Sequence, residues 1–143
     1  MYTHHIDTLR KSIAIGLRNQ GIEKLTAPLF NALFERFPET QNAFDAKSLE
    51  SFAPQKFKLV SELIIDTFAH PAYAEISIIN EIVRHQMYDL KDKEYYFTLA
   101  ESVEFCVKKA CADDWDEDMQ ECWQDAITAF RGLVINAIRE ADL

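Results

Sequence analysis

The sequence has little of what divides a chain into short strands and turns: only three glycines and four prolines occur among its 143 residues. Long stretches contain neither residue, whereas an all-β chain needs the frequent turns that glycine and proline supply. With 48% hydrophobic and 12% aromatic residues, the chain can fill one core but is too short for two domains of ordinary size. We therefore expect a single all-α domain over residues 1–143.

Cysteine is also scarce, and no two cysteines are closely spaced. Cys106, Cys111 and Cys122 are odd in number and fall within segments of helical spacing. This pattern indicates neither a disulfide framework nor a cysteine zinc site. We expect all three to be reduced thiols in the core.

Positive charge is in deficit, because 15 lysines and arginines stand against 24 aspartates and glutamates, giving a net charge of −9. An acidic surface repels phosphate backbones and anionic lipids, which argues against binding to nucleic acid or to a membrane surface. No apolar run is long enough to span a bilayer, and the segment MYTHHIDTLRK lacks the apolar centre of a signal peptide. We expect a cytoplasmic protein.

What the sequence does have is apolar residues at helical spacing. They predict helices over residues 3–19, 22–37, 54–68, 73–87, 92–110 and 116–139, with a short helix over 38–44. The first helix is expected to bury a face formed by Ile6, Leu9, Ile13 and Leu17. Gly21 should end it, Pro28 should kink or delay the second helix, and Pro54 should occupy a first turn after a polar connection over 45–54. Helices of unequal length without a heptad seam favour crossings at large angles over a regular four-helix bundle.

One segment points to a particular chemistry. Residues 84–96, RHQMYDLKDKEYY, contain the pattern R-H-x-x-Y-x-L-x-x-x-x-Y, formed by His85, Tyr88, Leu90 and Tyr95. This pattern resembles the proximal region of bacterial single-domain globins and of the globin domain of flavohaemoglobins. The segment LFNALFERFPETQNAF resembles the second and third helices of that family, and the segment from Gln55 is similar to its distal helix. The resemblance implies a globin fold, with six to eight helices around a pocket for haem b.

Carried over position by position, the resemblance implies a role for each matching residue. His85 would be the axial ligand of the haem iron, with Tyr95 and Glu81 beside it on the proximal side. Phe30, Gln55 and Leu59 would line the distal pocket; in another helical register, Ala53 or Lys56 would replace Gln55. Further haem contacts are expected from Phe44, Leu59, Leu63, Ile78, Ile82, Tyr88 and Leu90.

The physical chemistry of a haem site adds one requirement. A histidine that binds iron through one ring nitrogen donates the N–H of the other nitrogen to an oxygen. A backbone carbonyl near Glu81 and the hydroxyl of Tyr95 are the two candidate acceptors.

Three positions depart from the family's pattern. Phe30 replaces the usual tyrosine and cannot donate a hydrogen bond to O2, so we expect O2 to dissociate faster than in relatives with tyrosine. Glu81 stands where an apolar residue is usual. Ile138 stands where a late glutamate is usual, and Glu140 lies two residues beyond it.

Three functions are compatible with these residues. The leading hypothesis is a haem globin that binds O2, NO or CO reversibly. The second is an enzyme that converts NO to nitrate with O2; because the sequence shows no flavin or nicotinamide domain, it would need a separate reductase. The third is a globin-fold regulatory or sensor module with weak or no haem binding. This hypothesis is supported by Glu81 and Phe30, two residues that depart from the family's pattern near the expected haem site. A homodimer is compatible with each.

The simplest alternative interpretations involve no ligand at all. A histidine at the end of an apolar helix is more often a capping or core residue than a ligand, and an aromatic stripe is usually core packing. His4, His5 and His70 are expected to be exposed and without function. The acidic segment around Trp115 is most simply the solvated start of a helix, where carboxylates favour the helix dipole.

Overall fold

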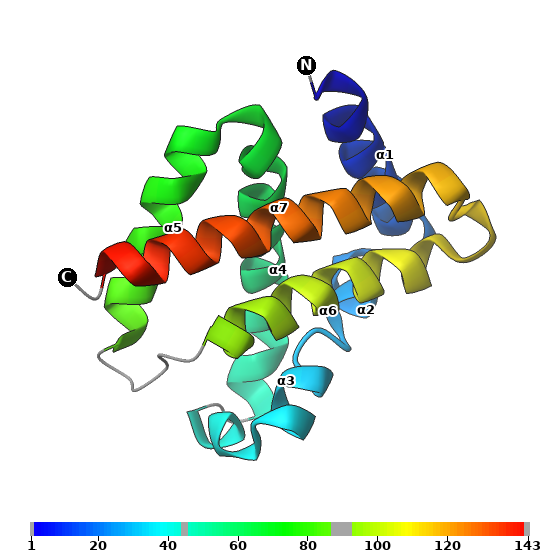
Figure 1. The fold of residues 1–143 in the computed structure, drawn as a ribbon. Helices are drawn as coiled ribbons and strands as arrows, with labels where there is room; N and C mark the ends of the chain where they lie inside the picture. Colours follow the sequence, from blue (N-terminus) through cyan, green and yellow to red (C-terminus); the bar gives the residue numbers. More distant parts are fainter. Residues whose placement is uncertain (1, 44–45, 87–92, 142–143) are drawn as a thin grey trace.

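The computed structural model describes residues 2–43, 46–86 and 93–141. These residues form helices and connecting turns, with no strand among them, which confirms the all-α prediction. In chain order the elements are α1 (Thr3–Gln20), α2 (Ile22–Thr26), α3 (Asn31–Arg36), the 3-10 helix η1 (Pro38–Ala43), α4 (Ala46–Ala69), α5 (Pro71–Gln86), α6 (Lys93–Cys111), the 3-10 helix η2 (Ala112–Asp114) and α7 (Glu117–Ala141) (Figure 1). Within the described ranges, no helix is both long and apolar enough to cross a membrane.

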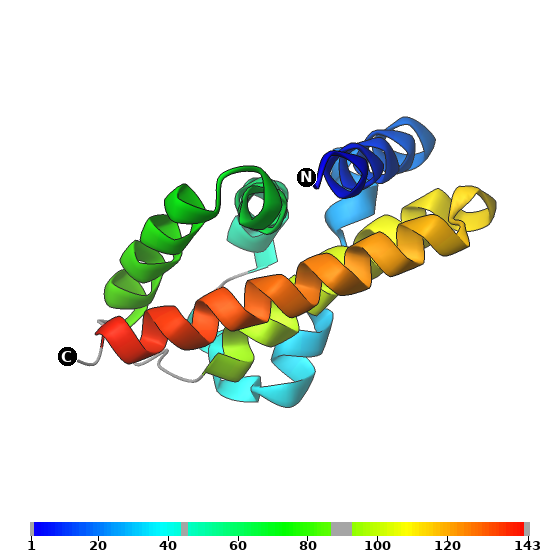
Figure 2. The same cartoon turned by 45° about the horizontal axis from the view of Figure 1, so that its top comes forward.

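The long helix α7 connects two parts of the molecule. Its N-terminal half lies beside α1, and its C-terminal half packs against α5 (Figures 1 and 2). Helix α6 runs alongside α7, while α4 crosses both and is seen nearly end-on in Figure 2. Because α4 contacts α5 as well, the helices α4, α5, α6 and α7 converge on one region of the fold.

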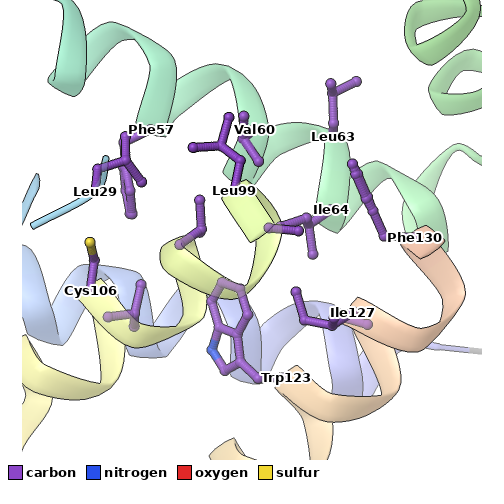
Figure 3. Packing of buried hydrophobic residues seen from close by; sticks show 14 of the residues in the cluster. Leu29, Phe57, Val60, Leu63, Ile64, Leu99, Cys106, Trp123, Ile127 and Phe130 are labelled. Carbon is purple, nitrogen blue, oxygen red and sulfur yellow. The ribbon is translucent and has the colours of Figure 1, made fainter. Parts of the chain in front are cut away.

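The centre of the core lies where α4, α6 and α7 cross. Its largest fully buried side chain is Trp123 of α7, which lies near Ile64 and Ile127 in Figure 3. The indole Nε1–H of Trp123 donates to the Ser12 hydroxyl at 2.8 Å, and this hydroxyl donates to the Leu9 carbonyl at 2.7 Å. The buried polar groups of Trp123 and Ser12 are therefore hydrogen-bonded, as burial in an apolar core requires.

Helix α1 packs most of its predicted apolar face on the core, since Leu9 is buried and Ile6 and Ile13 are partly buried against the core. The buried residues are Thr8, Leu9, Ser12 and Gly16, whereas Leu17 is 36% exposed. A Cβ at Gly16 would lie only 3.0 Å from Leu25 Cδ1 and 3.1 Å from Ala110 Cβ, so small residues let α1 approach its neighbours closely. This close approach adds Ser12 and Gly16 to the buried side of α1, and the prediction from apolar spacing holds for Ile6, Leu9 and Ile13 but not for Leu17.

Most helices begin or end at the glycine, proline and capping residues that mark helix ends in the sequence. Gly21 ends α1 at φ 80°, and its N–H donates to the Leu17 carbonyl at 2.8 Å. Asp116 caps α7, since its Oδ1 accepts the Met119 N–H at 2.8 Å. The expected second helix is interrupted around Pro28 and forms α2 and α3. The three cysteines are free and buried, as predicted.

The predicted connection before Pro54 was wrong. Helix α4 already begins at Ala46, so Pro54 lies inside it rather than in its first turn. Proline has no N–H to donate to the carbonyl four residues earlier, which weakens a helix locally. Leu49, Phe52 and Ala53 pack on the core, and their burial favours the helical path despite the proline.

Candidate functional site

His85 lies in the last turn of α5 and is fixed by one hydrogen bond. Its Nδ1 lies 2.6 Å from the backbone carbonyl of Glu81, one turn earlier. A carbonyl only accepts hydrogen bonds, so Nδ1 carries the proton and, in a neutral ring, Nε2 keeps the lone pair. Of the two acceptors expected from the sequence, the Glu81 carbonyl is the one used.

The side chain of His85 lines a cavity of about 30 Å³ between α4 and α5, which α6 and α7 help to enclose. A space of this size holds roughly two water molecules. The apolar part of its wall consists of Leu59, Val60, Leu63, Ile78, Leu99 and Phe130, several of which appear in Figure 3. Lys56, Glu81, His85 and Tyr96 provide the polar part.

A second, larger space adjoins this cavity. It is a groove of about 200 Å³ between α4 and α5, and it shares Leu59, Leu63 and Glu81 with the cavity wall. Its outer wall is polar and includes Asp66, Ser77 and Asn80. The two spaces therefore lie side by side along the contact between α4 and α5.

Glu81 places a carboxylate in this largely apolar wall. Its Oε2 lies 3.9 Å from Lys56 Nζ, and its other oxygen, Oε1, is paired with Arg84 on the same helix. The Oε2 atom is buried and has no hydrogen-bond partner within the described residues. A buried carboxylate oxygen that is held only at ion-pair distance is costly, which marks Glu81 as a candidate functional residue.

Burial in the cavity wall shifts the pKa of His85. Burial lowers the pKa of His85 to about 4, and the charges of Lys56 and Arg84 add to this effect. Glu81 Oε2 lies 3.7 Å from His85 Nδ1, but that carboxylate is already paired with both cations. At neutral pH, His85 is therefore an uncharged imidazole, the form that binds metals.

Two further groups also respond to burial. Burial lowers the pKa of Lys56 to about 8, with Arg84 contributing, so this lysine remains mostly protonated at pH 7. Burial raises the pKa of Tyr96 to about 12, and its ring meets the His85 ring edge-on with the centroids 5.9 Å apart. The cavity wall thus combines one neutral imidazole, one cation, one carboxylate and one phenol.

Several residues predicted from the sequence meet at this cavity: Leu59, Leu63, Ile78, Glu81 and His85. Ile82 is buried in the core beside them. Phe30 is buried too, but its ring stacks on Phe34 and Phe52, with centroids 5.7 and 5.8 Å away. Phe44, Tyr88 and Leu90 lie outside the described residues, so their expected haem contacts stay predictions.

Two of the expected residues, Gln55 and Tyr95, are not among the residues that line the cavity. Gln55 is exposed, and its alternative Lys56 lies on the cavity wall, because Lys56 shares a helix face with the buried residues Ala53 and Val60. The Tyr95 hydroxyl donates to Glu39 at 3.2 Å, whereas His85 Nδ1 donates to the Glu81 carbonyl.

The structure also adds wall residues that were not predicted for the site: Val60, Tyr96, Leu99 and Phe130. Val60 and Phe130 belong to apolar stripes that were visible in the sequence, and Tyr96 directly follows the predicted Tyr95. Their helix faces are set by packing between helices, which sequence spacing alone does not give.

The chain matches none of the protein-family models, curated proteins or solved structures with which it was compared. What the cavity can do therefore follows from its own side chains. Among the described residues, it offers one neutral imidazole on the wall of a largely apolar space, with a lysine, a glutamate and a tyrosine on the same wall.

Proposed function

We propose that the chain binds haem b between α4 and α5 in a globin-like fold, with His85 as the axial ligand of the iron. The observation that carries this proposal is the 2.6 Å hydrogen bond from His85 Nδ1 to the Glu81 carbonyl. Histidines that bind a metal through one ring nitrogen generally donate the other N–H to an oxygen in this way. The bond fixes the tautomer and leaves Nε2 as the ligand atom.

The walls of the cavity support the same proposal. Haem is a large, flat and mostly apolar group, and Leu59 and Leu63 of α4 face Ile78 of α5 across the cavity. The donor set and the apolar walls fit a haem. The cavity itself is much smaller than a porphyrin, so binding requires α4 and α5 to separate and the Lys56–Glu81 pair to open.

Haem bound in this way would supply an iron that binds diatomic gases, and we propose that it takes O2, NO or CO. On the chain's side, His85 would hold the iron, and the Glu81 carbonyl would keep the imidazole oriented through the hydrogen bond that it accepts. Lys56 is the polar residue that α4 brings to the cavity, and its ammonium group can donate a hydrogen bond to a polar gas ligand. It therefore takes the role that the sequence suggested for Gln55.

A second candidate function is a haem-free or weakly haem-binding sensor module. The specific observation in its favour is that the Lys56–Glu81 pair joins α4 to α5 across the space that haem would need. If this closed arrangement is the working state, His85 is a core residue whose Nδ1–H merely satisfies a carbonyl. The two candidates differ in one measurable property, the binding of haem through His85.

The test is a hemin titration of the full chain and of two histidine variants. We expect wild type to develop a Soret band that saturates at one equivalent, and the reduced protein to change its spectrum with CO. His85→Ala should lose this spectrum, and imidazole added to it should restore part of the band by replacing the missing ligand. His70→Ala is the matched control, since His70 is an exposed histidine at the break between α4 and α5.

Two results would count against haem ligation by His85. One is a wild-type chain that is folded by circular dichroism but gives no Soret band, which favours the sensor module. The other is the same haem spectrum in His85→Ala as in wild type, which would place the iron ligand elsewhere.

A further inference from the structure

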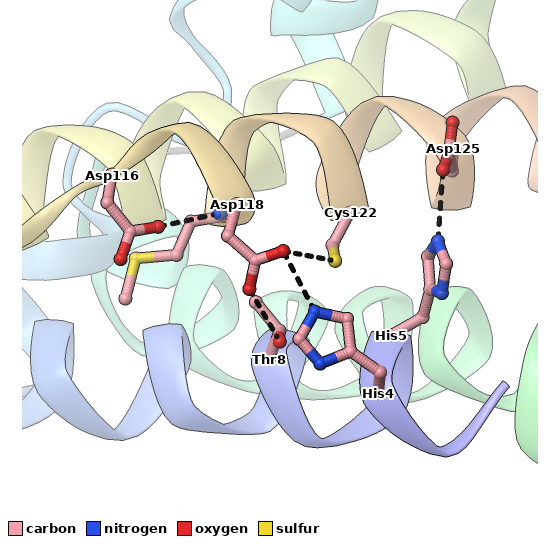
Figure 4. Close-up of polar contacts among 8 residues, drawn as sticks. His4, His5, Thr8, Asp116, Asp118, Cys122 and Asp125 are labelled. Carbon is pink, nitrogen blue, oxygen red and sulfur yellow. Dashed lines mark hydrogen bonds and ion pairs between the residues drawn. The ribbon is translucent and has the colours of Figure 1, made fainter.

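A second group of side chains with metal-binding atoms lies far from the cavity, between α1 and α7 (Figure 4). His4 Nε2 lies 2.8 Å from Asp118 Oδ1, and Cys122 Sγ lies 3.8 Å from the same oxygen. One ligand atom from each of these three residues lies within 4.8 Å of the other two. An imidazole, a carboxylate and a thiol therefore meet at one point.

We propose that His4, Asp118 and Cys122 bind a Zn²⁺ ion. Zinc accepts nitrogen, oxygen and sulfur ligands at about 2.0 to 2.3 Å, and in a tetrahedral site the ligand atoms stand roughly 3.3 to 3.7 Å apart. The observed separations bracket this range, so small side-chain rotations bring the three atoms around one ion. Three protein ligands leave the fourth tetrahedral position to a water molecule.

The helices hold these ligands in a rigid arrangement. Asp118 and Cys122 are four residues apart on α7 and so lie on the same face. His4 projects toward them from the first turn of α1. One turn further along α1, the Thr8 hydroxyl donates to Asp118 Oδ2 at 3.3 Å, which orients the carboxylate and leaves Oδ1 for the metal.

The burial of the three residues differs in a way that suits a metal site. Cys122 is only 2% exposed, whereas the side chains of His4 and Asp118 are 68% and 50% exposed. The thiol therefore forms the inner wall, and an ion can reach the site from solvent. Burial raises the pKa of the Cys122 thiol, with the Asp118 charge adding to the effect, so zinc binding has to displace the thiol proton.

The alternative is an ordinary surface ion pair between His4 and Asp118. The molecule provides a matched comparison, because His5 Nε2 lies 2.9 Å from Asp125 Oδ2 on the same two helices. This second pair offers an imidazole and a carboxylate without a thiol. A surface ion pair needs no third residue, whereas a zinc site depends on Cys122.

The experiment is a titration of the metal-free full chain with Zn²⁺ against a competing chromophoric chelator, repeated with Co²⁺ as a spectroscopic substitute. Wild type should bind one equivalent, and its Co²⁺ form should show thiolate-to-metal charge-transfer absorption. Cys122→Ser should lose that absorption, and His4→Ala should bind Zn²⁺ at least about tenfold more weakly. His5→Ala and His85→Ala should match wild type, which also separates this site from the haem proposal.

Three outcomes would overturn the proposal. They are no Zn²⁺ binding by folded wild type, a Co²⁺ spectrum without thiolate absorption, and an equal loss of affinity in His4→Ala and His5→Ala. Cys122 is buried, so Cys122→Ser could alter the fold. His4 is exposed, so His4→Ala should not alter the fold. Comparing the Zn²⁺ affinities of His4→Ala and His5→Ala therefore tests the proposal independently of Cys122→Ser.

Discussion

His85 and His4 each lie close to a carboxylate, yet the protein shifts their pKa values in opposite directions. At His85, burial and the charges of Lys56 and Arg84 lower the pKa to about 4. At His4, the hydrogen bond to Asp118 and the charge of that residue raise the pKa above its ordinary value. The partly buried imidazole of His85 is held neutral, and the exposed imidazole of His4 is stabilised as a cation.

The difference depends on what else each carboxylate contacts. Glu81 Oε2 is 3.7 Å from His85 Nδ1, but Glu81 is also paired with Lys56 and Arg84, so little of its charge acts on the ring. Asp118 contacts His4 at 2.8 Å, and its other partners, Thr8 and Cys122, are uncharged donors. A nearby carboxylate therefore does not fix the charge of a histidine, since burial and the remaining charges decide it.

The largest effect of this contrast should appear in the pH dependence of stability. Because the pKa of His85 is lower in the folded state than its ordinary value of 6.5, the unfolded chain binds more protons between pH 6.5 and 4. The contribution of His85 is thus fully present above pH 6.5 and is lost as the pH falls toward 4. A shift from 6.5 to about 4 corresponds to about 3 kcal/mol, and we expect about 2 to 3 kcal/mol because the side chain is 23% exposed.

Urea unfolding of wild type and His85→Gln at pH 6.5 and pH 4 measures this contribution. Other carboxylates and histidines titrate in both proteins, so only the difference between the two is assigned to His85. We expect the free energy of unfolding of wild type to fall by about 2 to 3 kcal/mol more than that of the variant. Parallel losses in the two proteins would mean that His85 is not held neutral by the fold.

A smaller effect should follow from removing one of the charges near His85. In Lys56→Met, we expect the pKa of His85 to rise, because the Lys56 charge is the second contribution to its lowering. The pKa should remain below the ordinary value, since burial is the larger cause. The unfolding free energy should fall by about 1 kcal/mol, as Glu81 keeps only its pairing with Arg84.

Proton NMR titration of the His85 ring, together with urea unfolding, checks both effects. Lys58→Met is the matched control, because Lys58 is an exposed lysine two residues further along α4. An unchanged His85 pKa in Lys56→Met would show that burial alone produces the shift. The same stability loss in both variants would show that the Lys56–Glu81 pair has no special role.

The sequence predicted the helices well because apolar periodicity and capping signals are local. It failed at Pro54, where packing overrides the local signal, and at Leu17, which is exposed although the rest of its predicted face packs on the core. The burial of Leu49, Phe52 and Ala53 extends α4 ahead of the proline. Both failures involve contacts with other helices, which no single segment specifies.

The candidate haem site was predictable in part for the same reason. Helical spacing identified His85, Leu59, Leu63 and Ile78, but Lys56 and Tyr96 line the cavity where their neighbours Gln55 and Tyr95 do not. A shift of one residue turns a side chain by about 100° around a helix, so a small error in register changes which group faces the cavity.

The proposed zinc site had only one local signal, the spacing of Asp118 and Cys122. His4 is 114 residues away from Asp118 in sequence, and only the packing of α1 on α7 brings it there. His4 is exposed, as expected, but its imidazole nevertheless pairs with the carboxylate of Asp118. Contacts between helices that are distant in sequence create this site, and the spacing of residues within one helix does not reveal them.

The smallest expected effect concerns His4, and it tests whether Asp118 raises the pKa of this exposed histidine. In metal-free protein, Asp118→Asn removes the charge next to His4, so the pKa of His4 should fall back toward its ordinary value. The ion pair stabilises the fold below pH 6.5, and that contribution is lost as the pH rises through the raised pKa, the opposite sign to His85. NMR titration with a chelator present measures the His4 pKa directly.

The control is Asp125→Asn, which alters only the neighbouring His5–Asp125 pair. This variant should leave the pKa of His4 unchanged. If the His4 pKa is the same in Asp118→Asn as in wild type, the carboxylate does not govern it, and the two histidines differ through burial alone.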